Sequence, residues 1–278
     1  METNTAFGKP SLPGQALQGG VLVAVYFLVL FTIEVVYSAS ATGSQRFMPL
    51  VPDMISGEDR MVQIRQDASK YTDAKPIGQS VNERTGTEFG YSFFLFIEPS
   101  TFTGSSAYKH VFHKGYLEPW PLMGPGVFIN GATNTMRVVM NTYKQPFTYV
   151  DIKNIPVDKW FHVVLNCYKG GLDVFINGFL ANRLSFLDTV PYQNFGDIYV
   201  FSPQHSTQLR GPVIAALGES YFDLDGAMKG FLSRLIYTRY ALSTGEIQSI
   251  LNAGPSQKID QKMMDKPPYL ADTWWAQQ

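Results

Sequence analysis

The chain has 278 residues, with 22 Lys and Arg against 23 Asp and Glu, so its formal net charge is -1. A balance near zero, without any run of basic residues, excludes a surface whose overall field attracts nucleic acid or anionic lipid. Aromatic residues make up 14% and charged residues only 16%, alongside 24 Gly and 17 Pro. This composition is typical of an all-β domain with many turns, part of whose surface is covered by partners. The single cysteine, Cys167, excludes an intramolecular disulfide and is expected to be a small buried hydrophobe.

The first element in chain order is an apolar run at residues 19–37, behind a polar arm at residues 1–18. Its 19 residues rise about 28 Å as a helix, close to the roughly 30 Å of a bilayer's hydrocarbon core. The run therefore predicts a single transmembrane helix, and Glu34, its only charge, lies about one turn from the end and reaches the headgroup region. The residues that represent this membrane anchor are Val21, Leu28, Phe31 and Glu34.

A cleaved signal peptide is the alternative, because Ser38 to Ala41 supply an A-x-A pattern with cleavage after Ala41. The length of the apolar run favours a retained anchor, as do the preceding residues, whose only base is Lys9. The few flanking bases leave the topology open.

A proline-containing linker is expected at residues 38–57, followed by a globular domain at residues 58–254. Short runs of β-branched and aromatic residues between Gly, Pro, Asn and Asp clusters predict many strands and little helix. The predicted strands are Met61–Arg65, Tyr91–Ile97, His110–Lys114, Val127–Asn130, Met136–Thr142, Phe147–Ile152, Trp160–Cys167, Leu172–Ile176, Phe179–Leu184, Asp197–Ser202 and Met228–Tyr240. The pattern favours a sandwich or a barrel.

Two local signals are sharper than the rest. Asn177-Gly178 between apolar residues predicts a β-hairpin with a type I′ turn. Ser243 and Glu246 form a capping box, and Gly254 ends the short helix that this box begins.

These signals belong to a longer pattern. The segment IPVDKWFHVVLNCYKGGLDVFINGFLANRL resembles the W-x-H-V strand and NG hairpin of laminin-G-like domains, in the concanavalin A-like lectin/glucanase superfamily. The closing segment MKGFLSRLIYTRYALSTGEIQSIL is similar to that family's last strand and helix, and YSFFLFIEP and HVFHKG match its opening strands. The resemblance covers about residues 60–254 and implies an antiparallel jelly-roll β-sandwich. Trp160 and His162 are then structural residues.

No catalytic, cofactor or metal residues are expected. Glycosidases of this superfamily need paired carboxylates in an E-x-D-x-x-E or E-x-D-x-E pattern, which the chain lacks. Asp223 and Asp225 are interpreted as a solvated loop edge, with a calcium site as the weaker alternative. His110 and His113 lie three apart on a predicted strand, so their side chains are expected on opposite faces.

Two classes of function remain. A membrane-held glycan-binding module would use Tyr116 and Trp120 to stack on sugar rings, although Trp120 between two prolines is favoured as a residue that packs on its own loop. A structural protein would instead dock through Trp274 and Trp275 in an extended tail at residues 255–278, because a free tail is not expected to carry adjacent tryptophans. Folding of this pair back onto the sandwich is the alternative.

The combination of an anchor, a non-catalytic sandwich and extended arms resembles membrane-associated minor capsid proteins of large icosahedral DNA viruses. This resemblance implies a non-enzymatic protein that links an inner membrane to a capsid shell within a virion, with capsid proteins and the membrane as partners. An accessory subunit of a large cellular membrane complex is a further alternative.

Overall fold

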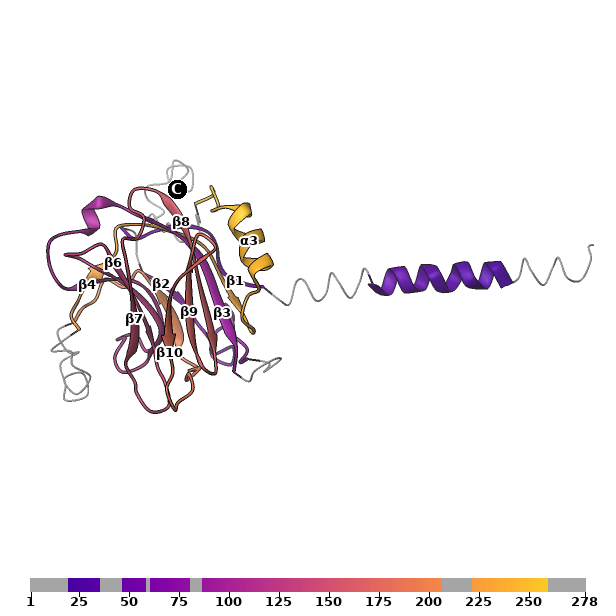
Figure 1. Cartoon of the computed structure of the whole chain (residues 1–278), viewed down its shortest axis with the longest axis horizontal. Helices are drawn as coiled ribbons and strands as arrows, with labels where there is room; N and C mark the ends of the chain where they lie inside the picture. The colour runs from indigo at the N-terminus through magenta and orange to yellow at the C-terminus, as the bar shows by residue number, and fades with distance from the viewer. Residues whose placement is uncertain (1–19, 36–46, 59–60, 81–86, 207–221, 260–278) are drawn as a thin grey trace, which may run out of the picture. The chain divides into compact units, whose positions relative to one another are not determined.

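The computed structural model describes residues 20–35, 47–58, 61–80, 87–206 and 222–259. The chain divides into a unit at Met1–Phe47 and a second, much larger unit at Met48–Gln278 (Figure 1).

The described part of the first unit is a helix at residues 20–35, within the expected span at 19–37. All its described residues are exposed, among them Val21 at 55%, Leu28 at 66% and Phe31 at 67%, and Glu34 is exposed as well. Among the described residues, no helix combines the length and the apolar character that crossing a membrane requires. The transmembrane span at residues 19–37 stays a prediction.

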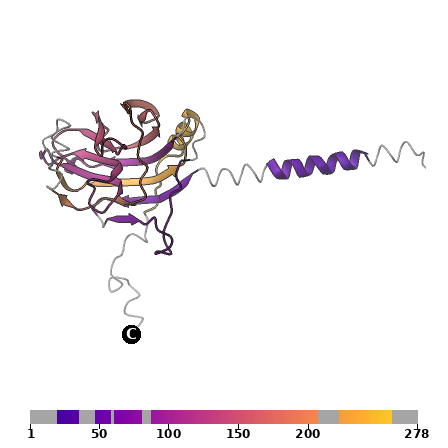
Figure 2. The same ribbon diagram turned by 90° about the horizontal axis from the view of Figure 1, so that it is seen from below.

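The second unit is a sandwich of two sheets, as predicted, in which all but one of the strand pairs are antiparallel. Sheet A has six strands in the order β1-β14-β3-β8-β9-β10, and Figure 2 shows purple β1 beside orange β14. The strands of sheet A are β1 (Met48–Ser56), β14 (Gly230–Thr238), β3 (Phe89–Ile97), β8 (Trp160–Tyr168), β9 (Gly171–Ile176) and β10 (Phe179–Ser185).

Sheet B has eight strands, six of them in the order β12-β13-β4-β5-β6-β7, and β11 pairs with both β4 and β2. Its strands are β12 (His205–Ser206), β13 (Leu224–Ala227), β4 (Tyr108–Gly115), β5 (Met123–Asn130), β6 (Thr135–Met140), β7 (Thr148–Lys153), β11 (Asp197–Val200) and β2 (Val62–Ile64). Strand β13 runs parallel to β4. The pairs β12–β13 and β4–β5 on either side are antiparallel. The described part of the unit also contains two helical elements, η1 (Pro99–Thr101) and α3 (Thr244–Ala253).

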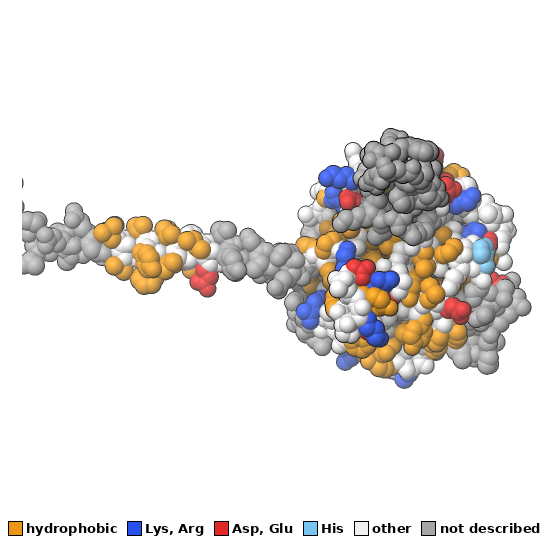
Figure 3. Space-filling view, turned by 180° about the vertical axis from the view of Figure 1, so that it is seen from behind, with side chains coloured by type: hydrophobic (Ala, Val, Ile, Leu, Met, Phe, Trp, Pro, Cys, Tyr) orange, Lys and Arg blue, Asp and Glu red, His pale blue; other side chains and the backbone are white. Residues whose placement is uncertain are grey.

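The main core lies between the sheets and follows the two-residue period of the strands. In β3, Phe89, Tyr91 and Phe93 belong to this core, whereas Ser92 faces the other side and bonds His162. Cys167 is fully buried in the same core, as the sequence predicted. A second apolar cluster, which includes Phe128, lies on the opposite face of sheet B. The face in Figure 3 shows hydrophobic side chains between charged ones of both signs.

Both sharp local predictions are confirmed. Asn177 and Gly178 have φ values of 50° and 83° in the hairpin turn between β9 and β10. Ser243 and Glu246 form a capping box at the start of α3, and Gly254 ends this helix with a φ of 66°.

The expected linker at residues 38–57 is not wholly a linker, because β1 begins at Met48. Its prolines are tolerated since β1 is an edge strand that pairs with β14 alone within sheet A, with register shifts beside Pro49 and Val51. The expected tail also begins within the fold. Ile259 forms a parallel bridge to Met54, and the Met54 N–H donates to the Lys258 carbonyl at 2.8 Å.

Candidate functional site

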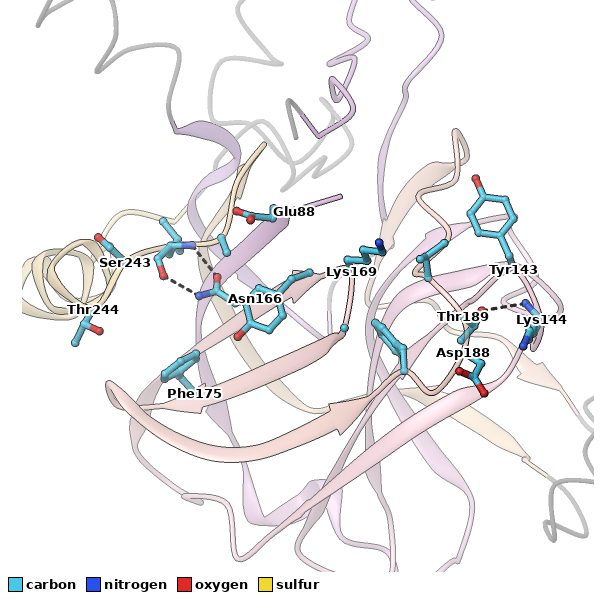
Figure 4. A pocket seen from close by; sticks show the side chains of 16 residues that line it. Glu88, Tyr143, Lys144, Asn166, Lys169, Phe175, Asp188, Thr189, Ser243 and Thr244 are labelled. Atoms are coloured by element: carbon cyan, nitrogen blue, oxygen red, sulfur yellow. Dashed lines mark hydrogen bonds between the residues drawn. The ribbon is translucent and has the colours of Figure 1, made fainter. Parts of the chain in front are cut away.

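The described residues form an open cavity of about 1090 Å³, here called the main cavity (Figure 4). It lies between the start of α3, the β8–β9 hairpin and two loops near residues 143 and 188. Its lining residues are Glu88, Tyr143, Lys144, Asn166, Tyr168, Lys169, Gly170, Phe175, Phe186, Asp188, Thr189, Val190, Ala241, Leu242, Ser243 and Thr244.

One wall of the main cavity is fixed to sheet A by a buried amide. Asn166 on β8 is 3% exposed, its Nδ2 donates to the Leu242 carbonyl at 2.8 Å, and its Oδ1 accepts from the Leu242 N–H at 2.9 Å. Because both ends of the amide are used, the segment before α3 is held at a defined place on the sheet. The capping box at Ser243 therefore positions the start of α3 beside the cavity.

Aromatic rings supply the apolar part of the lining. Phe186 is 7% exposed, and its N–H donates to the Gly170 carbonyl at 3.0 Å. The Tyr168 hydroxyl donates to the Asp173 carboxylate, and burial together with this bond raises the pKa of Tyr168 well above its ordinary value. Tyr168 therefore stays neutral and presents an uncharged ring to the cavity.

The opposite wall carries Tyr143 on a turn that backbone bonds hold to the chain near residue 190. The Tyr143 N–H donates to the Val190 carbonyl at 3.2 Å, and the Lys144 N–H donates to the Thr189 Oγ1 at 3.3 Å. The Tyr143 ring packs edge-on against Tyr192, with centroids 5.2 Å apart, and remains 71% exposed. The turn thus presents a positioned aromatic ring to solvent at the cavity's rim.

Charged groups surround this rim without a dominant sign. Lys144, Lys169 and Asp188 are exposed, whereas Glu88 is 3% exposed and lies away from Asp188 across the cavity. The site thus combines aromatic faces with hydroxyl, amide, ammonium and carboxylate groups.

The two aromatic residues expected to stack on sugars lie elsewhere. Tyr116 is 60% exposed and Trp120 is half-buried, with its ring centroid 6.5 Å from that of Phe147. Trp120 thus packs onto the second apolar cluster, and not on its own loop as the packing interpretation expected. Neither residue lines the main cavity. Trp274 and Trp275 lie outside the described residues, so their docking role stays a prediction.

The expectation that His110 and His113 face opposite ways is wrong. A β-bulge at Val111 lets Phe112 pair with Val127 and His113 with Gly126, which turns both imidazoles to the same face of sheet B. His110 Nε2 and His113 Nδ1 are 2.6 Å apart. Burial lowers the pKa of both rings, that of His113 to about 4.

Asp225 on β13 is paired with two basic side chains. The Asp225 carboxylate contacts Lys109 Nζ at 2.6 Å and His205 Nδ1 at 2.9 Å, and these contacts, with that of Lys109 the larger, hold the pKa of Asp225 below its ordinary value. Within the part of the chain that the structure describes, no three His, Cys, Asp or Glu side chains gather into a metal site.

Sequence reasoning missed the main cavity because its lining comes from segments far apart in the chain. Tyr143, Lys169 and Asp188 lie on three separate turns, and no single motif joins them. The one local signal is a solvated turn that carries an aromatic residue, TYKQ at residues 142–145.

Comparisons with known proteins find similar structures but no similar sequence. No protein-family model matches the chain, and no curated protein matches it. The receptor binding domain of botulinum neurotoxin mosaic serotype C/D has a TM-score of 0.48 and 11% identity, over 75% of this chain and 45% of that one. The ligand binding domain of botulinum neurotoxin serotype D, in complex with N-acetylneuraminic acid, has a TM-score of 0.45 and 12% identity, over 75% and 42%.

The binding domain of Paraclostridial Mosquitocidal Protein 1 has a TM-score of 0.47 and 10% identity, over 72% of this chain and 42% of that one. The chain thus spans less than half the length of each of these structures. Similarity of this extent assigns neither a function nor a ligand. The expected laminin-G-like membership and the capsid role gain no support from the comparisons and stay predictions.

Proposed function

We propose that the sandwich unit is a non-enzymatic glycan-binding module, built on a concanavalin A-like jelly roll, and that the main cavity is its binding site. The observation that carries the proposal is the pairing of aromatic and polar groups around one open cavity. Tyr143 offers an exposed ring, Tyr168 and Phe186 supply further aromatic lining, and Lys169 and Asp188 stand beside them.

Sugars have the matching chemistry. Each ring has a face of C–H groups that packs on the electron-rich face of an aromatic side chain, and hydroxyl groups at its edge that bond polar side chains. Ligand cavities of roughly 300–1,000 Å³ hold molecules larger than a single sugar ring, and the volume here is about 1090 Å³. The turn that carries Tyr143 is fixed by its bonds to residues 189 and 190, so little ordering is needed on binding.

The test is to screen the full chain on a glycan array and to measure the affinity of the strongest ligand by calorimetry. Tyr143→Ala should weaken binding about tenfold or more while leaving the melting temperature unchanged, because the ring is largely exposed. Phe195→Ala is the matched control, since Phe195 is 72% exposed and does not line the cavity.

Two results would overturn this assignment. An array without any bound glycan would reject the function. A loss of binding in Tyr116→Ala, with Tyr143→Ala unaffected, would move the site to the Tyr116 and Trp120 loop that the sequence indicated.

A structural role at a membrane, with the capsid bridge as its most concrete form, is the second candidate. The helix at residues 20–35 favours it, because apolar residues such as Leu28 and Phe31 are more than 60% exposed, an arrangement that suits an apolar environment supplied by another molecule. The full chain should then float with phosphatidylcholine vesicles, and Leu28→Lys with Phe31→Lys should abolish flotation. A chain that stays unbound would reject the membrane role.

A further inference from the structure

A second, smaller cavity adjoins the main one and shares a side chain with it. This side cavity has a volume of about 110 Å³ and is lined by Gln79, Ser80, Thr87, Tyr143, Pro191 and Gln193. Tyr143 lines both cavities, so the two adjoin at this residue. Thr87 and Glu88, which are adjacent in the chain, line the side cavity and the main cavity respectively.

The two cavities differ in chemistry. The main cavity has several aromatic residues in its lining, whereas five of the six residues around the side cavity carry an amide or a hydroxyl group. Such a lining suits the hydroxyl groups at the edge of a sugar, but the side cavity alone is too small to hold a whole ligand.

The side cavity is built on a fixed network. Gln193 Oε1 accepts from the Ser80 N–H at 3.0 Å, and its Nε2 donates to the hydroxyl of Tyr237, a core residue, at 2.6 Å. Ser80 Oγ in turn accepts from the Glu88 N–H at 2.7 Å. These bonds connect the side cavity to the sandwich core and to the wall of the main cavity, so the distance between the two cavities is set by the fold.

We propose that the site takes an oligosaccharide of at least two units, with one unit in the main cavity, Tyr143 at the junction, and hydroxyl groups of the next unit in the side cavity. This inference rests on the proposed function. It goes further because it requires an extended glycan and excludes a single terminal sugar as the whole ligand.

The experiment compares mono-, di- and trisaccharide fragments of the glycan that the full chain selects, by calorimetry. The disaccharide should bind at least tenfold more tightly than the monosaccharide. Thr87→Phe fills the side cavity and should remove most of this gain without changing the affinity for the monosaccharide. Thr87→Val removes only the hydroxyl and keeps the shape of the side chain. It should reduce the affinity advantage of the disaccharide, and it serves as the control if Thr87→Phe fails to fold.

The outcomes separate this inference from the proposed function. If a monosaccharide binds as tightly as the longer fragments, glycan binding stands and the two-unit site is overturned. If the gain persists in both Thr87 variants, the side cavity is not the second position. If no fragment binds, the proposed function itself fails.

Discussion

His110 Nε2 lies 2.6 Å from His113 Nδ1, and a backbone N–H on the far side of His110 determines how both rings are protonated. The Ser202 N–H donates to His110 Nδ1 at 2.9 Å, so the proton of His110 is on Nε2 and points to His113. His113 then carries its proton on Nε2 and donates to the Tyr116 carbonyl at 2.7 Å. Two neutral imidazoles thus connect the Ser202 backbone to the loop that begins at Tyr116.

Acid should destabilise the fold through these buried rings. Burial lowers the pKa of His113 from 6.5 to about 4, so the unfolded chain binds a proton more readily than the folded one. The contribution of neutral His113 to the free energy of unfolding is complete above about pH 6.5. It decreases as the pH falls and is lost by about pH 4. The difference of about 2.5 pKa units corresponds to roughly 3 kcal/mol.

Urea unfolding between pH 7 and pH 5, followed by tryptophan fluorescence, measures this effect. His113→Gln should lower the stability at pH 7 and make its pH dependence shallower, because the replacement does not titrate. An equally steep dependence in the variant would show that other groups cause the acid sensitivity.

The sequence was sufficient for elements that local chemistry decides. Asn177-Gly178 requires positive φ values, and Ser243 with Glu246 satisfies the first N–H groups of a helix, so both predictions depend on neighbouring residues alone. The strands between turns were found for the same reason, since their two-residue period is visible locally.

Features that depend on pairing were missed. The bulge at Val111 exists because β4 pairs with β5 in a particular register, and this single extra residue reverses the expected separation of His110 and His113. Strand β1 was taken for a linker because its prolines count against a strand unless it lies at an edge. The main cavity was missed because Tyr143 and Lys169 meet only after the sheets have formed.

Arg137→Lys should destabilise the sandwich by about 1–3 kcal/mol. The Arg137 guanidinium makes two bonds of 2.8 Å to Asp151 and lies 3.8 Å from the ring centroid of Tyr149, with only 7% of the side chain exposed. A lysine ammonium keeps the charge but loses the second bond and the flat stacking surface.

Chemical denaturation of the two proteins measures this difference. Arg65→Lys is the matched control, because Arg65 also pairs with a carboxylate, Asp73, and also lies over a tyrosine ring. Its side chain is 39% exposed, so the control should change stability by less than about 0.5 kcal/mol. Equal losses of stability in Arg137→Lys and Arg65→Lys would contradict the role given to the buried Arg137 guanidinium.

The residues after α3 should stabilise strand β1. The Ser256 N–H donates to Ser233 Oγ at 2.9 Å, its hydroxyl donates to Asp53 at 3.0 Å, and the Met54 N–H donates to the Lys258 carbonyl. A chain that ends at Gly254 lacks all three bonds, each of which contributes about 1 kcal/mol to local stability. Amide exchange at Met54 and along β1 should therefore be faster in this shorter chain.

Hydrogen exchange with mass spectrometry tests this difference against a chain that ends at Ile259 and keeps the three bonds. The longer chain should protect β1 as the full chain does. Equal protection in the chain that ends at Gly254 would show that β14 alone holds the strand.

Two alanine substitutions at glycines should change stability in opposite directions. Gly178 has a φ of 83° in the hairpin turn, so Gly178→Ala forces a Cβ into a left-handed conformation and should cost about 1 kcal/mol or more. Space is not the cause, because the added Cβ would lie 3.5 Å from Leu251 Cδ2, an ordinary contact. Gly245 lies in the first turn of α3, where an added Cβ meets nothing within 4 Å.

Gly245→Ala should therefore stabilise the protein by up to about 1 kcal/mol, because alanine loses less backbone entropy than glycine when a helix forms. Thermal and urea unfolding of the two variants and the parent chain measure both changes in stability in one experiment. A stabilising Gly178→Ala would contradict the type I′ turn, and a strongly destabilising Gly245→Ala would contradict the open surface at the start of α3.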